Sequence, residues 1–360
     1  MTEEFKPDTV PANGSPVVEK NFLRKRFFNV RTLISLILAV GLIVVIFTQF
    51  NVDFSEMWEK IKGCNHWYFA LAFVSYYLTF PLRALRWRYL LHHAGIRKDQ
   101  GVEMPSLLAL TQMVMMNWFA NSVLYASLGD AYRAYLFKER TGVSFSKTMG
   151  TLLAERFLDI LVVVLLTVVS IVWLLLTGGH AWTIFGVVLI IGIVLLAAIA
   201  IALGGMGKFG HKLVNLLPKK IRVFYTLFEQ GALSSFGQLR ILTMLTVVIW
   251  LLEAGRLILV AQSLGIPIIE VGIALFIFAA LANALITAIP LTPGGLGLVE
   301  GGVTKLLQIG LSETTALLVT LVDRTISFLS VIVVGLLVFA YWHVMEAVRK
   351  RRSVRANIQQ

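Results

Sequence analysis

Residues 290–302 read PLTPGGLGLVEGG, a run with five glycines, two prolines and one carboxylate that lies between two long apolar stretches. Glycine and proline are the poorest helix formers, yet a chain inside a bilayer must satisfy its backbone polar groups internally. Irregular backbone at membrane depth survives only where protein covers it or where it lines a water-filled cavity. We therefore predict that this segment is a broken, buried helical element beside a cavity.

The composition of the chain indicates a membrane protein. Of its 360 residues, 58% are hydrophobic and 14% are charged, whereas an average soluble domain is about 25% charged. Two short glycine-containing pieces lie at 126–141 and 290–311. Stretches suited to crossing a bilayer are predicted at 32–50, 67–91, 105–125, 148–176, 182–204, 240–262, 270–289 and 313–342. The predicted fold class is an all-α polytopic membrane protein.

The net charge of +12 comes from lysines and arginines that gather next to the apolar spans. These clusters lie at 20–31, 83–98, 205–240 and in the C-terminal tail. Basic clusters of this kind orient spans and contact anionic lipid head groups, so we expect both termini in the cytoplasm and no nucleic acid partner. The single cysteine excludes an intrachain disulfide. The histidines lack metal-ligand spacing, and no cofactor is expected.

Two segments of the chain resemble each other. LGDAYRAYLFKERTGVSFSKTMGTLLAERFLDILVVV, which starts at Leu128, aligns at a constant offset with LGLVEGGVTKLLQIGLSETTALLVTLVDRTISFLSVI, which starts at Leu296. The informative aligned positions are glycines and charges: Gly129 with Gly297, Glu155-Arg156 with Asp323-Arg324, and, further upstream, Arg86 with Arg256. The basic loops place the two copies in opposite orientations. An inverted repeat with broken segments is typical of transporters whose site lies at the repeat interface.

The repeat gives the predicted domain organisation. Residues 1–20 form a disordered cytoplasmic tail, 21–180 the first transmembrane repeat, 181–345 the second, and 346–360 a basic cytoplasmic tail. Each repeat is predicted to hold an outer span, a span that ends in an arginine, a broken or re-entrant helical element, and a span that opens with an acid–arginine pair.

Charged residues inside the spans form the candidate site. Each charge at the bilayer centre costs about 2.5–3.5 kcal/mol, so these groups are expected to pair. Residues three apart share a helix face, which predicts the pairs Asp130 with Arg133, Arg156 with Asp159, and Glu253 with Arg256. Two interpretations are open: the pairs are structural contacts between helices, or they form a polar cavity whose arginines hold a lipid phosphate.

The substrate-binding candidates are ordered by their place in the repeat. Arg156 and Arg324 come first because the repeat places them symmetrically. The others are Arg133, Glu300, Glu155, Asp323, Asp130 and Arg256. The half-helix that follows Thr292 is expected to point its N-terminus at an anion, and Glu300 or Glu155 is expected to carry protons. Arg86 and Arg256 are interpreted as positive-inside anchors or caps at the membrane end, with a functional role as the alternative, and no catalytic residue is predicted.

Four stretches carry a family resemblance: RALRWRYLL (83–91), LGDAYRAYLFKERTGVSFSKTMGTLLAERFLDIL (128–161), IPLTPGGLGLVEGG (289–302) and LVDRTISFLS (321–330). They resemble the transmembrane, flippase-like region of lysylphosphatidylglycerol synthases over about 30–345. Members of that family often have Pro-Gly before the glycine at 129, where this chain reads YASL, so the first broken element is expected to be more regular. Nothing after residue 345 is long enough for the synthase domain, so a stand-alone member is expected.

The resemblance implies an integral membrane flippase rather than an enzyme. Its cargo would be a phosphate-bearing lipid, whether anionic, aminoacylated or polyprenyl-linked, moved between the leaflets of a prokaryotic plasma membrane. The expected partners are that phospholipid or polyprenyl-linked lipid and an envelope-lipid enzyme. Two alternatives stay open: a non-catalytic membrane partner of such an enzyme, and a lipid-carrier glycosyl or phosphoryl transferase. The transferase would normally need acidic metal sites or nucleotide-binding loops, which the sequence does not display.

Overall fold

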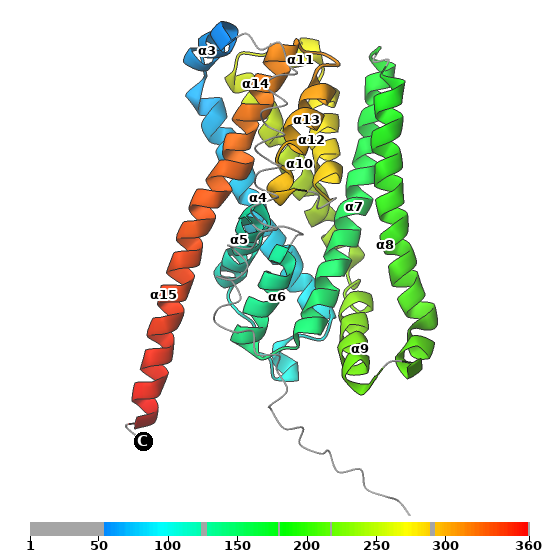
Figure 1. The fold of residues 1–360 in the computed structure, drawn as a ribbon, viewed down its shortest axis with the longest axis vertical. Coiled ribbons are helices and arrows are strands. Elements are labelled where there is room, and N and C mark those ends of the chain that lie inside the picture. The colour runs from blue at the N-terminus through cyan, green and yellow to red at the C-terminus, as the bar shows by residue number, and fades with distance from the viewer. Residues whose placement is uncertain (1–53, 124–127, 179–180, 217, 289–291, 359–360) are drawn as a thin grey trace, which may run out of the picture.

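The computed structural model describes residues 54–123, 128–178, 181–216, 218–288 and 292–358. These residues form a bundle of helices that run mainly along the long axis of the molecule (Figure 1), and no strand occurs among them. The tail 1–20 and the predicted span 32–50 lie outside the described residues. The all-α fold class is confirmed for the described part of the chain.

The elements follow one another along the two halves of the chain. The first half holds α3 (Phe54–Lys62), α4 (His66–His93), the 3₁₀ turn η1 (Lys98–Gln100), α5 (Leu107–Val123), α6 (Leu128–Thr141) and α7 (Phe145–Leu176). The second half holds α8 (Trp182–Leu216), α9 (Lys219–Leu233), α10 (Leu239–Ser263), α11 (Ile268–Val271), α12 (Ile273–Ala288), the 3₁₀ turn η2 (Pro293–Gly295), α13 (Leu298–Leu307), α14 (Glu313–Arg324), the π-helical turn η3 (Thr325–Leu329) and α15 (Ser330–Ile358).

Five of the described helices are long and apolar enough to cross a membrane. They are α4, α7, α8 over Trp182–Gly210, α10, and the continuous rod from α14 into α15 over Glu313–Trp342. Their outer faces remain apolar: Val169, Val194 and Val333 are each about 60% exposed. Rows of exposed aliphatic side chains along whole helices suit lipid and not water. The chain is therefore a multi-pass membrane protein, as the composition predicts.

Two of the predicted spans are helices that turn back inside the bundle. The stretch 105–125 becomes α5, of 17 residues, and 270–289 becomes α12, of 16 residues. Figure 1 shows α5 and α6 as a hairpin from the lower end of the molecule, and α12 and α13 as a hairpin from the upper end. The two tips meet, because η2 packs against α5 and Gly294 lies beside Ser122. The broken elements are thus re-entrant.

Helices at matching places in the two halves run in opposite directions. In Figure 1, α4 descends and α10 ascends, and likewise α7 ascends whereas α14 and α15 descend. The helices α4 and α10 pack along each other, and the hydroxyl of Ser75 donates to the carbonyl of Leu252 at 2.8 Å. These courses are the ones that an inverted repeat would produce. The inversion as a symmetry of the whole fold, and the boundary between residues 180 and 181, stay predictions.

Glycines shape the two hairpins in different ways. In η2 and at the start of α13, the backbone of Gly294, Gly295 and Gly297 has φ of 58°, 72° and 81°, a region that side-chain-bearing residues avoid. Gly129 is helical instead, and a Cβ there would collide with the carbonyl oxygen of Asn117 on α5. The second hairpin therefore needs glycine for its turns. The first needs it for close helix contact, and the expected regularity of its turn stays a prediction, because residues 124–127 lie outside the described part of the chain.

Candidate functional site

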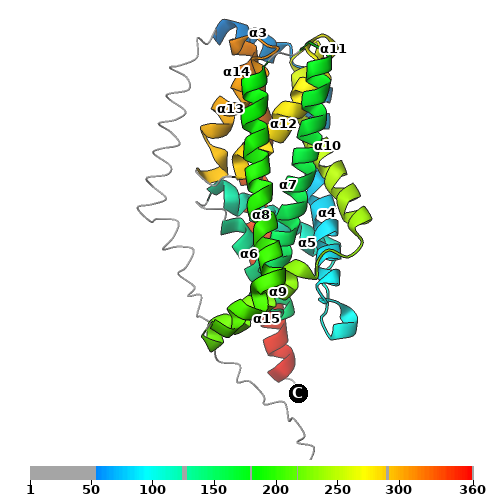
Figure 2. The same ribbon diagram turned by 90° about the vertical axis from the view of Figure 1, so that its right-hand side faces the viewer.

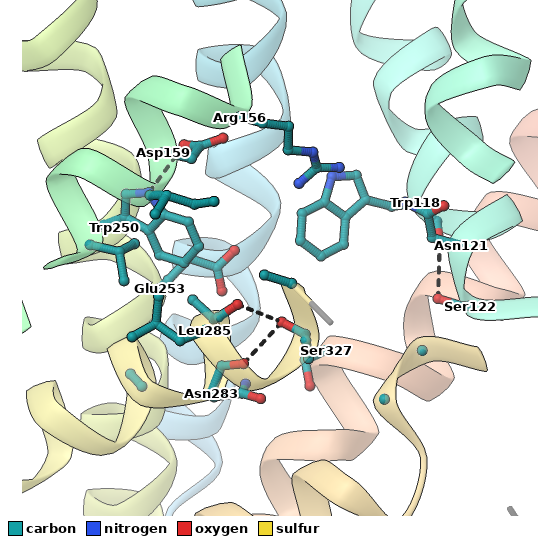
Figure 3. Close-up of a pocket in the computed structure, with 18 of the residues that line it drawn as sticks. Trp118, Asn121, Ser122, Arg156, Asp159, Trp250, Glu253, Asn283, Leu285 and Ser327 are labelled. Carbon is teal, nitrogen blue, oxygen red and sulfur yellow. Dashed lines mark hydrogen bonds between the residues drawn. The ribbon is translucent and has the colours of Figure 1, made fainter. Parts of the chain in front are cut away.

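A cavity of about 430 Å³ lies where the two hairpin tips meet. Figure 3 shows side chains from α5, α7, α10 and α12 pointing into it. Part of the lining is polar or charged: Arg83, Asn121, Asp130, Arg156, Asp159, Glu253, Arg256, Asn283 and Arg324. Another part is aliphatic: Leu153, Ile160, Val163, Leu195, Ile199, Ala280, Ala284, Leu285 and Ala288. The cavity is therefore amphipathic, with a size within the range of about 300–1,000 Å³ that holds small ligands.

The first half supplies a buried charge network behind the polar part of the lining. Arg86 is fully buried on α4 and donates to Asp159 at 2.6 and 2.9 Å and to Glu155 at 3.0 Å. Arg133 of α6 donates to the other oxygen of Glu155 at 3.1 Å and lies over the Trp87 ring at 3.8 Å. Burying charges is tolerated only when they are paired and hydrogen-bonded. This network therefore ties α4, α6 and α7 together.

The second half supplies a matching network. Arg256 of α10 donates to Asp323 of α14 at 2.7 Å and to Glu253 at 2.5 Å. Glu253 also accepts from Arg83 of α4 at 3.0 Å, which joins the two halves. Arg83 is stacked between two tryptophans, 4.9 Å from the ring centre of Trp118 and 5.4 Å from that of Trp250, whose ring edge is placed by a bond to Asp159.

Arginines at positions that the sequence repeat matches each pair with an acid. The pair Arg86–Glu155 in the first half corresponds to Arg256–Asp323 in the second, with both partners aligned. Arg156 and Arg324 are also aligned, and each pairs with an acid of its own hairpin, Asp130 or Glu300. These two acids are not aligned, because the repeat matches Asp130 with Leu298 and Glu300 with Tyr132.

The pair between Arg156 and Asp130 faces the cavity. The guanidinium donates to both carboxylate oxygens at 2.9–3.1 Å, and Asn117 donates to the same carboxylate at 2.8 Å. The Arg156 side chain is 44% exposed and that of Asp130 is 18% exposed. In Figure 3 the Arg156 side chain extends from α7 toward Trp118. An arginine in this position can bind a second oxyanion by a movement of its side chain alone, while its backbone stays in the helix.

The pair between Arg324 and Glu300 is sealed instead. The two side chains are 11% and 8% exposed, with Nε and Oε1 separated by 2.7 Å. Arg324 also donates to the carbonyl of Gly294 at 2.9 Å, and Glu300 accepts the backbone N–H of Gly297 at 2.6 Å. The side chain of Glu300 thus caps the backbone N–H of Gly297, and the orientation of this helix N-terminus toward a ligand anion stays a prediction.

The eight predicted site residues divide into two groups. Arg156, Arg324, Asp130 and Arg256 line the cavity. Glu300 and Asp323 pair with Arg324 and Arg256, whereas Arg133 and Glu155 pair with each other in the buried network around Arg86. Their role in substrate binding stays a prediction.

Spacing along a helix was a poor guide to pairing. Glu253 and Arg256 do pair, as predicted. The predicted pairs Asp130–Arg133 and Arg156–Asp159 are wrong, because each side chain finds its partner on a neighbouring helix. The interpretation of Arg86 as a membrane-end anchor is also wrong, since this arginine is at the centre of the first network.

Sequence reasoning missed several residues that line the cavity: Arg83, Trp118, Asn121, Trp250, Asn283 and Ser327. The sequence places Arg83 in the basic cluster 83–98 that orients a span, but this residue is 3% exposed inside α4. A signal was available for α5, because polar residues within a membrane helix mark functional interiors and Asn117 and Asn121 recur there one turn apart.

The fold and the cavity define a class: a multi-pass helical membrane protein with a charged, partly apolar chamber between two re-entrant hairpins. Comparison with known families makes this specific. Residues 32–335 match the family described as the lysylphosphatidylglycerol synthase TM region. The chain belongs to this family.

Several curated proteins are similar to the chain. A UPF0104 membrane protein of Methanocaldococcus jannaschii is 30% identical over 223 residues, which cover 61% of this chain and 93% of that protein. A UPF0104 membrane protein of Methanothermobacter thermautotrophicus is 23% identical over 342 residues, 87% of this chain and 94% of that protein. The glycosyltransferase AglD of Haloferax volcanii is 26% identical over 317 residues, 77% of this chain but 49% of AglD, so the chain spans about half of that relative.

Proposed function

We propose that the protein is a lipid transporter that moves a phosphate-bearing lipid between the two leaflets. The observation that carries the proposal is the position of Arg156, which is partly exposed and lines a cavity whose lining combines charged and aliphatic side chains. A lipid with a phosphate head group combines the same two kinds of surface. The cargo class covers anionic, aminoacylated and polyprenyl-linked lipids.

Arg156 is proposed as the ligand of the head-group phosphate. Its planar guanidinium donates several hydrogen bonds to the Asp130 carboxylate, and two phosphate oxygens can accept hydrogen bonds in the same bidentate geometry. Asp130 keeps its hydrogen bond from Asn117 when Arg156 turns to the phosphate. Without cargo, the Asp130 carboxylate thus occupies the place of the phosphate and balances the charge of Arg156.

Charge balance supports exchange of one anion for another at this point. The network contains six arginines, Arg83, Arg86, Arg133, Arg156, Arg256 and Arg324, and six acids, Asp130, Glu155, Asp159, Glu253, Glu300 and Asp323. A balanced network holds an anion most readily where one acid can leave its partner. Asp130, which is the most exposed of these acids in the ion pairs, meets that requirement.

The test is leaflet transfer in liposomes with fluorescent phosphatidylglycerol and, in parallel, a labelled polyprenyl phosphate. Wild type is expected to transfer at least one of them faster than empty vesicles, and Arg156→Gln is expected to lower the rate about tenfold or more, the value of one lost charge-assisted hydrogen bond. Arg97→Gln is the matched control, because Arg97 is 41% exposed and also paired with an aspartate, Asp99, but lies outside the cavity. Equal rates for both variants, or no transfer of either lipid, would overturn the proposal.

A second candidate function comes from the similarity to the glycosyltransferase AglD. Among the described residues, no group of three or more His, Cys, Asp or Glu side chains is arranged to hold a metal ion. A transferase role would show as sugar transfer from a nucleotide sugar to polyprenyl phosphate by the purified chain. A non-catalytic role would show as a stoichiometric enzyme partner on purification, with no transfer between leaflets by the chain alone.

A further inference from the structure

The aliphatic part of the cavity lining indicates where the hydrocarbon chain of the cargo would lie. It is built by Ile160 and Val163 of α7, Leu195 and Ile199 of α8, and Ala284 of α12. All five are aliphatic: Ile160 and Val163 are buried, and the three from α8 and α12 are half-buried. No polar side chain interrupts α8 between Leu195 and Ile199, so this part of the lining suits a hydrocarbon chain and not a soluble anion.

The cavity is too small for a whole lipid. About 430 Å³ matches a small ligand, whereas each acyl chain of a phospholipid extends across about half of a 30 Å hydrocarbon layer. A head group at Arg156 therefore leaves its chain starting inside the cavity and continuing beyond it. The continuation must follow an apolar path that leads toward the bilayer.

Helix α8 provides that path. It stands at the edge of the bundle in Figure 1 and runs along its near face in Figure 2, with exposed aliphatic residues on its outer side. It meets α12 closely at Gly192, where a Cβ would crowd Leu285. Leu195 and Ile199 follow one and two turns later on the cavity side. Leu195 and Ile199 thus form an inner aliphatic strip on α8, and the same helix separates this strip from the membrane.

We infer that Leu195 and Ile199 of α8 form a subsite for the hydrocarbon chain of the cargo, so that the first part of the chain travels inside the protein together with the head group. This inference rests on the proposed function, because it takes Arg156 as the anchor of the phosphate. The substrate class is an amphiphile with one phosphate and a long acyl or prenyl chain. A soluble phosphate would bind at Arg156 without using this strip.

The direct test uses wild-type protein in nanodiscs and phosphatidylglycerol with a photoreactive diazirine near the ester end of one acyl chain. After irradiation, labelled residues are located by mass spectrometry. We expect labelling at Leu195 and Ile199, and loss of that labelling in Arg156→Gln. Labelling of Val194, which is 60% exposed on the outer face, serves as the control and should not change. A polyprenyl phosphate with the same reactive group forms the second arm.

A transport measurement separates this inference from the proposed function. Leu195→Trp fills the strip and is expected to slow transfer of long-chain lipid about tenfold, whereas Val194→Trp should stay within about twofold of wild type. Binding of inorganic phosphate should be unchanged in both variants. Two results would overturn the chain subsite even if wild type transfers lipid. One is that neither probe labels Leu195; the other is that both probes still label it in Arg156→Gln. Failure of wild type to transfer any lipid would instead overturn the proposed function.

Discussion

Arg156 and Arg324 occupy matching positions in the two halves, and each pairs with an acid of its own re-entrant hairpin. Their surroundings differ. Asp130 is held by Arg156 and one amide, and its pair is open to the cavity. Glu300 is held by Arg324 and also caps the first turn of α13, and its pair is closed. The comparison teaches that arginines at aligned positions can form ion pairs of different exposure, and from that difference we predict an exchangeable pair at Arg156 and a structural pair at Arg324.

The largest expected effect concerns the sealed pair. Arg324→Gln leaves Glu300 as a buried, unpaired charge and removes a bond to the η2 turn, so it should lower stability by about 3–5 kcal/mol. Arg156→Gln should cost less than about 1 kcal/mol, because an exposed ion pair contributes little. Unfolding of both variants in the same detergent, followed by circular dichroism, measures the difference. Equal losses of stability would mean that the two pairs do not have different roles.

The next effect concerns the matched glycines. Gly297→Ala forces a side chain into a backbone with φ of 81° and should cost about 1–3 kcal/mol of stability. Gly129→Ala should cost a similar amount for another reason, since the new methyl group pushes α6 away from α5. Gly186→Ala on α8, where a Cβ meets no neighbour, is the control and should not lower stability, because alanine is the better helix former. Thermal melting of the three variants checks this, and a neutral Gly297→Ala would contradict the described turn.

The smallest effect concerns the exchangeable acid. Asp130→Asn removes the anion that competes for Arg156 while leaving an oxygen to accept from Asn117. The affinity for short-chain, water-soluble phosphatidylglycerol should rise about two- to fivefold, the range of an exposed ion pair. Isothermal titration in detergent measures it, with the surface substitution Asp99→Asn as the control. A fall in affinity would show that Asp130 contributes to binding and does not occupy the place of the phosphate.

Much of the fold was predictable because it follows from apolar length and from helix-breaking residues. The spans at 67–91, 148–176, 182–204, 240–262 and 313–342 are found as helices, since about 20 apolar residues have one favourable arrangement in a bilayer. The broken segment at 290–302 was also identifiable, because its glycines adopt conformations that other residues avoid.

The site was predictable in part. The repeat marked Arg156 and Arg324, and both line the same cavity. The repeat could not show that Glu300 caps a helix, because that depends on the path of the backbone through Gly297. Arg83 and Arg86 follow an apolar run and have the pattern of a positive-inside anchor. Their burial arises from the packing of α10 and α7 against α4, a long-range event that no local spacing encodes.

The measurement that tests the central claim most directly is an experimental density map of the protein in nanodiscs that contain the lipid it transfers. We predict a phosphate in the cavity at about 3 Å from the Arg156 guanidinium, with its chain leading past Leu195, and Asp130 turned toward Asn117. A map that holds lipid on the outer faces of the helices alone, with the Arg156–Asp130 pair intact around an empty cavity, would contradict the account.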